Sequence, residues 1–458
     1  MGKEEYIRIL TEQIRCVKAR GMVADEVEKH IEDQIYSYRE QGMEEDKAME
    51  AAVRDMGDPV EAGVSMDRVH RPQIPWGMMA LMAVIGIVSI LIHAAFGGSS
   101  PELGPEYVIR QAVYTGIGFF AMVLVCMVDY SFLAEHSVGT ALGLLGVMLL
   151  SYFLLGREIN GAVRWISIGG LTMGLIPWIY LCVPVYGAIL YKYRGEHRWG
   201  IVKSLLWMAL MVLPVICMMD SLSSFVMLFL MLLFLFSTAV LRGWFQIRRR
   251  KCFLAVFWMG IILGGLVYLF ALTADRIRKT RLLLGLDPQG ANYVRCRVME
   301  ILRGSRWIGM GYGADFSEFV TTVPGFNQSY VLAFVASVFG YAAVIGLAVL
   351  FGWILFLIFR ISLGQKNELG MMISCGCGMV FSTLLLLYFL ENIGVLPYIS
   401  IDIPFISAGG SNVIVSYILA GIVMSVGRYK HVLPKELPVR KRDRKMPRVK
   451  ISVSLEKE

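Results

Sequence analysis

The chain has 458 residues, of which 56% are hydrophobic and 17% are charged, and its mean hydropathy is +0.61. Soluble domains average about 45–50% apolar and about 25% charged residues, so this composition excludes a soluble cytoplasmic enzyme. The formal net charge is +8, with residues 1–72 acidic overall and residues 428–458 strongly basic.

Residues 1–72 are predicted to form a small helical domain before the first membrane span. Apolar residues recur with helical spacing in three stretches that end at Gly21, Gly42 and Gly57, which predicts three short amphipathic helices. Because the flanking residues are mainly acidic, we expect these helices to pack on one another rather than on a membrane surface. With its closing Met-Gly-Asp-Pro sequence at 56–59, the segment resembles the prefix domain of some Gram-positive permease-like proteins.

From about Ile74 onward, uncharged apolar runs alternate with short polar breaks, and each run approaches the ~20 residues that a helix needs to cross a bilayer. The sequence therefore predicts an all-α, polytopic membrane protein with about ten transmembrane helices and both termini on one side. The predicted crossings cover residues 74–96, 108–128, 138–155, 173–191, 201–219, 222–241, 252–272, 329–358, 369–390 and 412–427.

Charge divides the chain into a helical prefix domain (1–72), a membrane domain (73–430) and a basic tail (431–458). The basic connections and the basic tail predict that both termini are cytoplasmic, because Lys and Arg are enriched in the cytoplasmic loops of membrane proteins. We expect the cationic cluster at 440–445 to anchor at the membrane, and nucleic-acid binding is the less favoured alternative. On the opposite face, the loop 273–328 is long enough to be functional.

Charged side chains within or beside the apolar runs are costly in a membrane and are therefore candidates for function. Arg110 and Asp220 lie near predicted span ends, where snorkelling to water or ending a helix explains them equally well. Glu391 and Asp402 are better placed, because they border a stretch rich in proline and glycine that cannot form one regular helix. Irregular backbone at membrane depth is expected to line a cavity or to be buried in protein.

This irregular stretch carries two motifs. An Asn-x-Gly-x-x-Pro sequence begins at Asn392, and a Pro-Phe-x-Ser-x-Gly-Gly-Ser sequence begins at Pro404. The second motif contains Ser407, Gly409, Gly410 and Ser411. With these motifs in register, residues 75–430 resemble the SEDS family of FtsW, RodA and SpoVE proteins. Other segments that match the family in order are Arg110-Gln111, Asn160-Gly161-Ala162, Arg164-Trp165, Asp220, Arg281, Asp287-Pro288 and the glycine-rich run 304–313.

The resemblance implies a peptidoglycan glycosyltransferase that polymerises a lipid-linked disaccharide precursor in cell-wall synthesis, cell division or shape control. It also implies a class B penicillin-binding transpeptidase as partner. Such a reaction needs a base for the acceptor hydroxyl and positive charge for the diphosphate, which Arg164 and Arg281 can supply. Trp165 can offer a flat face to a sugar, although an Arg-Trp pair is also an ordinary membrane anchor. The residues expected to bind substrate are Arg164, Trp165, Asp220, Arg281, Asp287, Asp402, Ser407, Gly409, Gly410 and Ser411.

No metal centre and no cofactor are predicted. The eight cysteines and six histidines are scattered through the chain without the pair spacing of a metal site. A divalent cation that holds the diphosphate of the substrate is compatible with the sequence, which assigns no site to it.

Three departures from the family pattern bear on the activity. The family's catalytic aspartate corresponds to Ser329, and two glutamates at the end of the same apolar run are absent. At the fourth span, the family's Gln-Pro-Ser-Glu is replaced by Ile-Pro-Trp-Ile at 176–179, and a lysine is replaced by Cys182. A serine hydroxyl cannot serve as the base without an activating group, so Asp315 and Glu318 in the same loop are the local substitutes.

Three functions therefore stay open at the level of sequence. A divergent but active glycan polymerase would use Asp315, Glu318, Asp287 or Asp402 as its carboxylate. A non-catalytic member would bind the precursor or a wall-synthesis partner and regulate it, which the loss of several acidic positions favours. A carrier would move the lipid-linked precursor across the membrane, although the sequence shows no constellation for a coupling ion.

Overall fold

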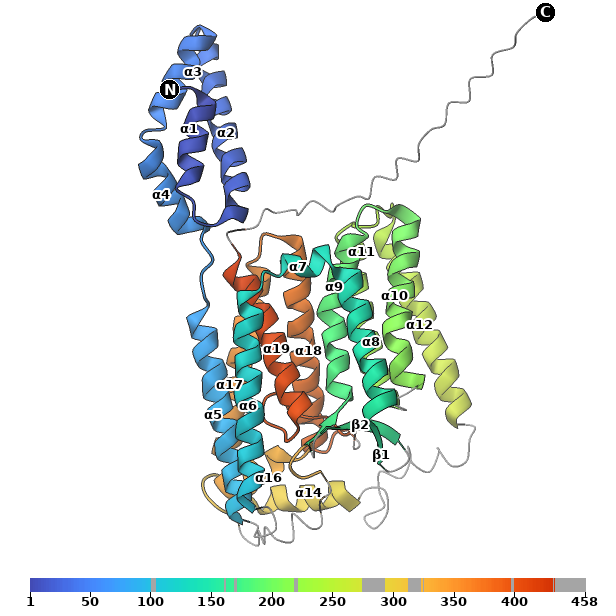
Figure 1. Cartoon of the computed structure of the whole chain (residues 1–458). Coiled ribbons are helices and arrows are strands. Elements are labelled where there is room, and N and C mark those ends of the chain that lie inside the picture. Colours follow the sequence, from blue (N-terminus) through green and yellow to red (C-terminus); the bar gives the residue numbers. More distant parts are fainter. Residues whose placement is uncertain are drawn as a thin grey trace, which may run out of the picture.

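The computed structural model shows a four-helix prefix domain beside one end of a larger helical membrane domain (Figure 1). We call that end of the membrane domain the prefix end and the opposite end the loop end. The structure describes residues 1–99, 104–159, 162–168, 171–217, 221–273, 293–311, 323, 325–396, 399–430 and 432.

The prefix domain consists of α1 (Lys3–Glu12), α2 (Val17–Glu40), α3 (Glu45–Asp55) and α4 (Pro59–His70). The prediction of three helices is wrong, because Gly21 lies inside α2 and the first turn falls between α1 and α2. A glycine in a helix costs only about 1 kcal/mol relative to alanine, which packing against neighbouring helices readily offsets. The domain has its own apolar core, formed by Tyr6, Leu10, Ile14, Ala19, Val23, Val27, Ile31, Ala52 and Val53.

Polar and apolar contacts attach the prefix domain to the membrane domain. Nζ of Lys18 lies 2.5 Å from Oδ2 of Asp129. The amide of Gln73 donates a hydrogen bond to the carbonyl oxygen of Arg428 (3.1 Å). Val432, which follows the last helix, is fully buried against the core of the prefix domain. The prefix domain and the linker after it are therefore joined to the membrane domain both at Asp129 and around the end of the last helix.

Eight helices in the described part of the chain are long and apolar enough to cross a membrane. They are α5 (Trp76–Ser99), α6 (Gly104–Met127), α8 (Ser137–Leu155), α10 (His197–Cys217), α11 (Leu222–Leu241), α17 (Tyr341–Leu363), α18 (Glu368–Asn392) and α19 (Gly410–Arg428). Two apolar segments occupy the other predicted crossings: the short pair η2 (Ile176–Leu181) and α9 (Cys182–Lys192), and α12 (Arg250–Thr273). The prediction of a polytopic helical membrane protein is confirmed, while the count of ten is not.

The predicted crossing 329–358 is wrong in its extent. The chain forms a short helix α16 (Val331–Phe339), breaks at Gly340 and continues as α17. Gly340 has φ +89°, and a Cβ added there would lie 2.7 Å from the carbonyl oxygen of Trp307. The apolar run is continuous across the break, so hydropathy shows only one segment, and the close approach of residue 307 decides where the crossing helix begins.

A small antiparallel sheet was not predicted. It consists of β1 (Gly156–Ile159), β2 (Ala162–Ile168) and β3 (Leu171–Gly174), in the order β1-β2-β3. Because β3 and η2 occupy residues expected to be helical, α9 begins at Cys182 and not near residue 173. The sheet lies at the loop end of the membrane domain (Figure 1).

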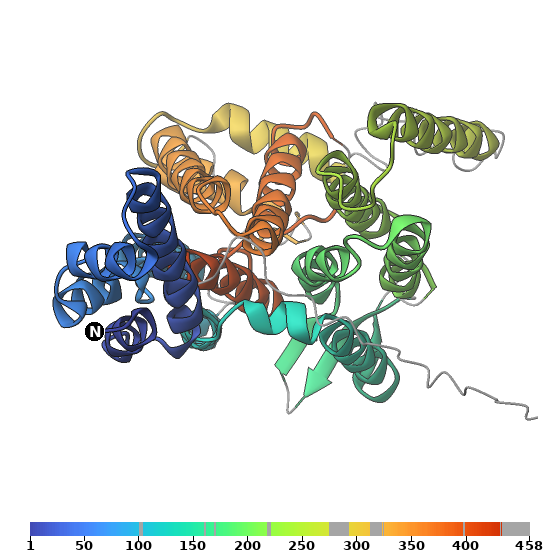
Figure 2. The same ribbon diagram turned by 90° about the horizontal axis from the view of Figure 1, so that it is seen from above.

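The last helix, α19, lies near the centre of the helix array (Figure 2). It is the most buried of the eight candidate spans, since 78% of its most apolar 18 residues are buried inside the protein. Glycines allow it to approach its neighbours closely. A Cβ added to Gly421 would lie 2.7 Å from the carbonyl oxygen of Met122 on α6. At its other end, Gly410 packs directly against the ring of Tyr114, also on α6. Small residues at such contacts are typical of helix pairs in membranes.

A short helix in the long loop lies across the loop end of the helices (Figure 1). This helix, α14 (Tyr293–Gly304), buries Val298 and reaches the connection after α18, where Arg295 donates a hydrogen bond to the carbonyl oxygen of Gly394. The remaining described part of the loop pairs with α16, since the amide of Gly311 donates to the carbonyl oxygen of Ser337 (2.9 Å). The loop therefore covers part of the irregular stretch between α18 and α19.

Candidate functional site

A polar cavity of about 430 Å³ opens at the loop end of the membrane domain. Its wall is built from the sheet, η2, the first turn of α11, the connection between α18 and α19, and the first turn of α19. The polar and aromatic residues that line it are Trp165, Tyr180, Ser223, Ser224, Gln328, Ser400, Asp402, Ser411 and Asn412. Among the described residues of this wall, Asp402 carries the one carboxylate.

Glu391 shapes the connection that presents Asp402. Its carboxylate is buried and accepts hydrogen bonds from the backbone amides of Ile399 (3.2 Å), Ser400 (3.3 Å) and Ile401 (3.4 Å). These bonds satisfy three amides that no helix or sheet pairs. Glu391, predicted as a functional candidate, therefore holds the backbone of the loop and does not line the cavity.

Asp402 lies in this connection, between the spanning helices α18 and α19. Burial raises the pKa of its carboxyl to about 7, and the charge of Glu391 acts in the same direction. A carboxyl with a pKa near 7 can accept a proton from a hydroxyl group around neutral pH. Its position in the wall and its basicity make Asp402 the described residue best suited to act as a general base.

Ser407 holds two backbone segments together and does not line the cavity. Its side chain is fully buried; Oγ donates to the carbonyl oxygen of Gln328 (2.6 Å) and accepts from the amide of Ile403 (2.8 Å). Nδ2 of Asn412 donates to the carbonyl oxygen of Ile403 (3.0 Å). Ser407, expected to bind substrate, instead joins the connection before α19 to the turn that carries Gln328.

Replacing Ser407 with alanine is expected to lower the free energy of unfolding by about 2 kcal/mol, because two buried hydrogen bonds are lost and their partners stay unpaired. The matched control is Ser416→Ala, since among the described residues Oγ of Ser416 bonds to the carbonyl oxygen of Asn412 within its own helix (2.7 Å) and to no other group. Thermal unfolding of the full chain in detergent measures the difference. Equal midpoints for the two variants would contradict this role.

Ser329, at the position of the family's aspartate, does not line the cavity, although its neighbour Gln328 does. Its side chain is 1% exposed, and Oγ has no hydrogen-bond partner among the described residues. Its carbonyl oxygen accepts a hydrogen bond from Nδ2 of Asn392 (2.8 Å), the first residue of the predicted motif. The described structure thus provides no group that could activate this hydroxyl.

The other predicted site residues divide into three groups. Those that line the cavity together with Asp402 are Trp165, Gly409 and Ser411. Gly410 packs on Tyr114, and Arg110 is exposed on α6 outside the cavity. Those outside the described residues are Asp220, Arg281, Asp287, Asp315 and Glu318, together with the side chain of Arg164. In the part of the chain that is described, no group of three or more His, Cys, Asp and Glu residues could hold a metal ion.

Several residues of the wall carry no functional signal in the sequence. Ser223 and Ser224 begin an apolar run, and Gln328 precedes another, so each is the polar end of a predicted span. In the sequence, Trp178 is distinguished only as a departure from the family pattern. Its Nε1 donates to Oγ of Ser411 (3.3 Å) and so fixes a hydroxyl of the cavity wall.

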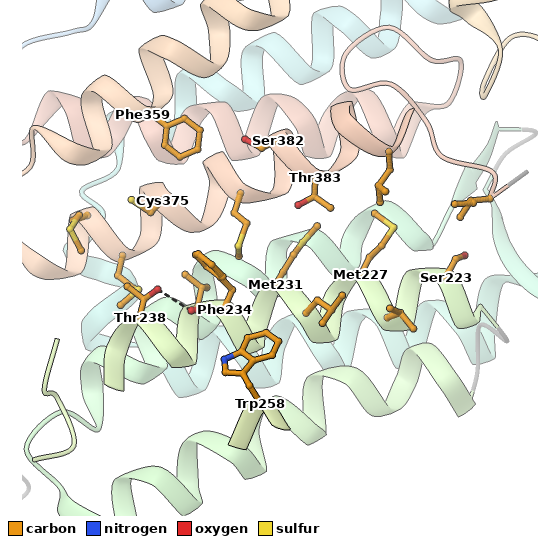
Figure 3. A pocket seen from close by; sticks show the side chains of 18 of the residues that line it. Ser223, Met227, Met231, Phe234, Thr238, Trp258, Phe359, Cys375, Ser382 and Thr383 are labelled. Carbon is orange, nitrogen blue, oxygen red and sulfur yellow. Dashed lines mark hydrogen bonds between the residues drawn. The ribbon is translucent and has the colours of Figure 1, made fainter. Parts of the chain in front are cut away.

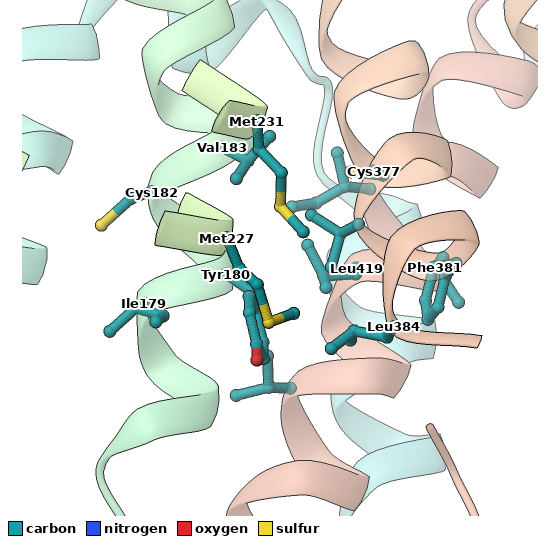
Figure 4. Close-up of a cluster of buried hydrophobic side chains, with 14 of the residues drawn as sticks. Ile179, Tyr180, Cys182, Val183, Met227, Met231, Cys377, Phe381, Leu384 and Leu419 are labelled. Atoms are coloured by element: carbon teal, nitrogen blue, oxygen red, sulfur yellow. The ribbon is translucent and has the colours of Figure 1, made fainter. Parts of the chain in front are cut away.

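A packed apolar cluster lies behind the cavity wall (Figure 4). Tyr180 and Met227 belong both to this cluster and to the wall, and Leu384 of α18 faces them from the opposite side. Met231 and Leu419 extend the cluster away from the cavity. The cavity therefore has an apolar floor and does not continue as a polar channel toward the prefix end in this part of the structure.

A second, apolar groove of about 1110 Å³ lies between α11, α12, α17 and α18. Figure 3 shows its lining along α11 from Ser223 to Thr238, with Trp258 of α12 facing it. The 20 residues of α11 correspond to a length of about 30 Å, which matches the hydrocarbon core of a bilayer. Ser223, Met227 and Ile399 line both this groove and the polar cavity, so the two spaces adjoin.

Comparisons with known proteins agree with this architecture. Residues 72–432 match the family model described as cell cycle protein, which covers FtsW, RodA and SpoVE. The chain is 26% identical over 382 residues to the probable peptidoglycan glycosyltransferase FtsW of Neisseria gonorrhoeae, covering 73% of this chain and 80% of the relative. It is also 26% identical over 369 residues to the protein of that name from Alcanivorax borkumensis, covering 76% and 90%.

Two solved structures share the fold. A chain from a peptidoglycan synthase complex superposes with a TM-score of 0.60 at 20% identity, covering 78% of this chain and 98% of that chain. The rod shape determining protein RodA of Thermus thermophilus superposes with a TM-score of 0.54 at 20% identity, covering 78% and 97%. The family match spans the whole membrane domain and confirms the resemblance drawn from the motifs at Asn392 and Pro404. The chain therefore belongs to the SEDS family of FtsW, RodA and SpoVE cell cycle proteins.

Proposed function

We propose that this protein polymerises a lipid-linked disaccharide precursor of peptidoglycan. The observation that carries the proposal is the junction of a polar cavity, which contains Asp402, with an apolar groove as long as a bilayer is thick. A substrate with a sugar diphosphate head and a polyprenyl tail needs such a pair of adjoining spaces. The relatives from Neisseria and Alcanivorax are named probable peptidoglycan glycosyltransferases, which supports the same reaction class.

In this proposal the head of the precursor enters the polar cavity. Asp402 accepts the proton of the acceptor hydroxyl as that oxygen attacks the sugar carbon that bears the diphosphate, and the diphosphate leaves with its lipid. Trp165 offers its ring to a sugar, and Ser411 and Asn412 offer hydrogen bonds. The described wall contains no Lys or Arg, so we assign the charge that holds the diphosphate to Arg164 and Arg281, or to a divalent cation.

The tail of the precursor lies in the groove along α11. The part of the lining that adjoins the cavity is rich in methionine, with Met227 and Met231 of α11 and Met379 of α18. Methionine side chains are unbranched and adapt to irregular apolar partners. A branched polyprenyl chain is such a partner, and the shared residues Ser223 and Ile399 mark where the tail meets the head.

A polymerisation assay tests this function. The full chain is reconstituted in liposomes with labelled lipid-linked disaccharide precursor, with and without a class B penicillin-binding transpeptidase. Glycan polymer made by the unmodified protein supports the proposal, and the absence of polymer under both conditions contradicts it. A partner of this type is itself part of the proposal, supported by the structural relative from a peptidoglycan synthase complex.

A second candidate function is binding of the precursor without catalysis, to regulate wall synthesis. The observation that favours it is the buried Ser329 hydroxyl, which has no activating partner in the described structure. Retained precursor binding without polymer in the same assay would identify this function. If polymer forms without a contribution from Asp402, the general base is expected to be one of the loop carboxylates Asp287, Asp315 and Glu318.

We propose that the prefix end faces the cytoplasm, which places the cavity at the outer surface. The basic connections 192–203 and 242–251 both lie at the prefix end, as expected for the cytoplasmic side. Trypsin added outside intact cells is expected to leave the cationic tail at 440–445 uncut and to cut it after the membrane is opened. Cleavage of the tail in intact cells would reverse the assigned orientation.

A further inference from the structure

The apolar groove ends at a cation. Arg242, the residue after the last turn of α11, lines the groove at its prefix end. Arg242 is exposed, and its Nη2 donates to Sδ of Met371 (2.7 Å), a weak acceptor. The carboxylate of Glu368, at the start of α18, pairs with two other residues and not with Arg242. It accepts a hydrogen bond from Nε1 of Trp244 (3.0 Å) and lies 3.6 Å from Nη1 of Arg194.

A second guanidinium group lies at the same helix end. Nη1 of Arg250 donates to the carbonyl oxygen of Leu241 (3.2 Å), and its guanidinium packs over Gly243, where no side chain intervenes. In the described part of the chain, no carboxylate lies within 4.0 Å of Arg242 or Arg250. With the exposed Arg248 and Arg249 in the same connection, the prefix end of the groove carries uncompensated positive charge.

The half of the groove next to these cations is apolar and has the length of one leaflet. Its wall includes Leu230, Phe234 and Thr238 of α11, Trp258 of α12 and Phe359 of α17 (Figure 3). Arg242 lies twelve positions after Leu230, which corresponds to about 18 Å along the helix. Half of a bilayer's hydrocarbon core is about 15 Å. An acyl chain that begins at the arginines would therefore fill this half.

We propose that this half of the groove binds an anionic phospholipid from the leaflet that faces the prefix domain. The phosphate head lies at Arg242 and Arg250, and one acyl chain follows α11 past Thr238 and Trp258. A precursor with its head in the polar cavity would reach the groove from the opposite end. The site is independent of the proposed polymerase function, because it needs neither the cavity nor Asp402.

Native mass spectrometry of the full chain in detergent tests the site, with dioleoyl phosphatidylglycerol and dioleoyl phosphatidylcholine as probes and no precursor present. The unmodified protein is expected to retain phosphatidylglycerol in preference to phosphatidylcholine. An arginine near the membrane surface contributes about 1 kcal/mol, so Arg242→Gln is expected to weaken phosphatidylglycerol binding about fivefold. Arg242→Gln combined with Arg250→Gln is expected to weaken it about 25-fold, and Arg242→Lys to retain most of it.

Two controls separate the site from general surface charge. Arg198→Gln removes an exposed arginine at the same end of the membrane domain, outside the groove lining, and is expected to leave binding unchanged. Thr238→Trp fills the groove without changing any charge and is expected to reduce binding of phosphatidylglycerol as strongly as the double variant. Equal loss with Arg198→Gln and Arg242→Gln would overturn the proposal, as would equal retention of the two lipids by the unmodified protein.

Discussion

Asp402→Asn is expected to lower the rate of glycan polymerisation at least about a hundredfold, because a positioned general base contributes about 10²–10⁴ in rate. Asparagine has nearly the same size and cannot accept the proton, so the cavity keeps its shape. The assay is that of the unmodified protein in liposomes. The matched control is Glu106→Gln, which removes an exposed carboxylate at the same end of the membrane domain, outside the cavity.

The rate of polymerisation is expected to depend on the ionisation of Asp402. Burial raises the pKa of Asp402 to about 7, so its carboxyl is mainly protonated below pH 7 and mainly ionised above it. Since only the ionised form is a base, the rate is expected to rise with pH through about 7 and then to level off. This rise should be absent from the residual activity of Asp402→Asn. An unchanged profile in that variant would assign the base to another carboxylate.

Gly421→Ala is expected to destabilise the membrane domain by about 2 kcal/mol, because the added Cβ would lie 2.7 Å from a backbone oxygen of α6 that cannot move as a side chain can. Gly346→Ala is the matched control. Gly346 lies in α17, and an added Cβ there meets nothing within 4 Å. Alanine favours a helix over glycine by about 1 kcal/mol, so this control is expected to stabilise slightly.

Thermal unfolding of the full chain in detergent measures the two glycine variants. The expected signs are opposite, although the substitution is the same. Because α19 carries Ser411 and Asn412 into the cavity wall, a shift of α19 away from α6 should also lower polymerisation by Gly421→Ala at temperatures where the protein is folded. Stabilisation by both variants would show that α6 and α19 are less tightly packed than the structure indicates.

Several site residues could be identified from sequence because the family motif and the chemistry agree. Asp402 is a carboxylate in an apolar region, and Gly409 and Ser411 belong to the motif that begins at Pro404; all of them line the cavity together with Trp165. The roles of Glu391 and Ser407 could not be identified in this way. Their side chains bond to backbone amides and carbonyls of the connection, and such partners depend on the path of the chain.

The wrong predictions have a common cause: each was based on the sequence of one segment, without the distant residues that pack against it. Hydropathy showed one apolar run at 329–358, and the break at Gly340 follows from the backbone of residue 307, which a local pattern does not include. The sheet at 156–174 was not predicted because its strands are short and adjoin an apolar run that reads as a helix. Gly21 suggested a helix end, while the packing of α2 carries the helix past it.

The sequence by itself determined the class of this protein, since long uncharged runs leave the backbone no alternative to membrane-crossing helices. It also determined the family, through motifs within one short irregular stretch. Only the tertiary structure decided which residues share a space. Trp165, Ser223, Gln328 and Asp402 are up to 237 positions apart in the chain. The packing of the sheet, α11, the turn before α16 and the connection between α18 and α19 brings them to one wall. Such contacts arise from packing between distant segments, which local composition does not encode.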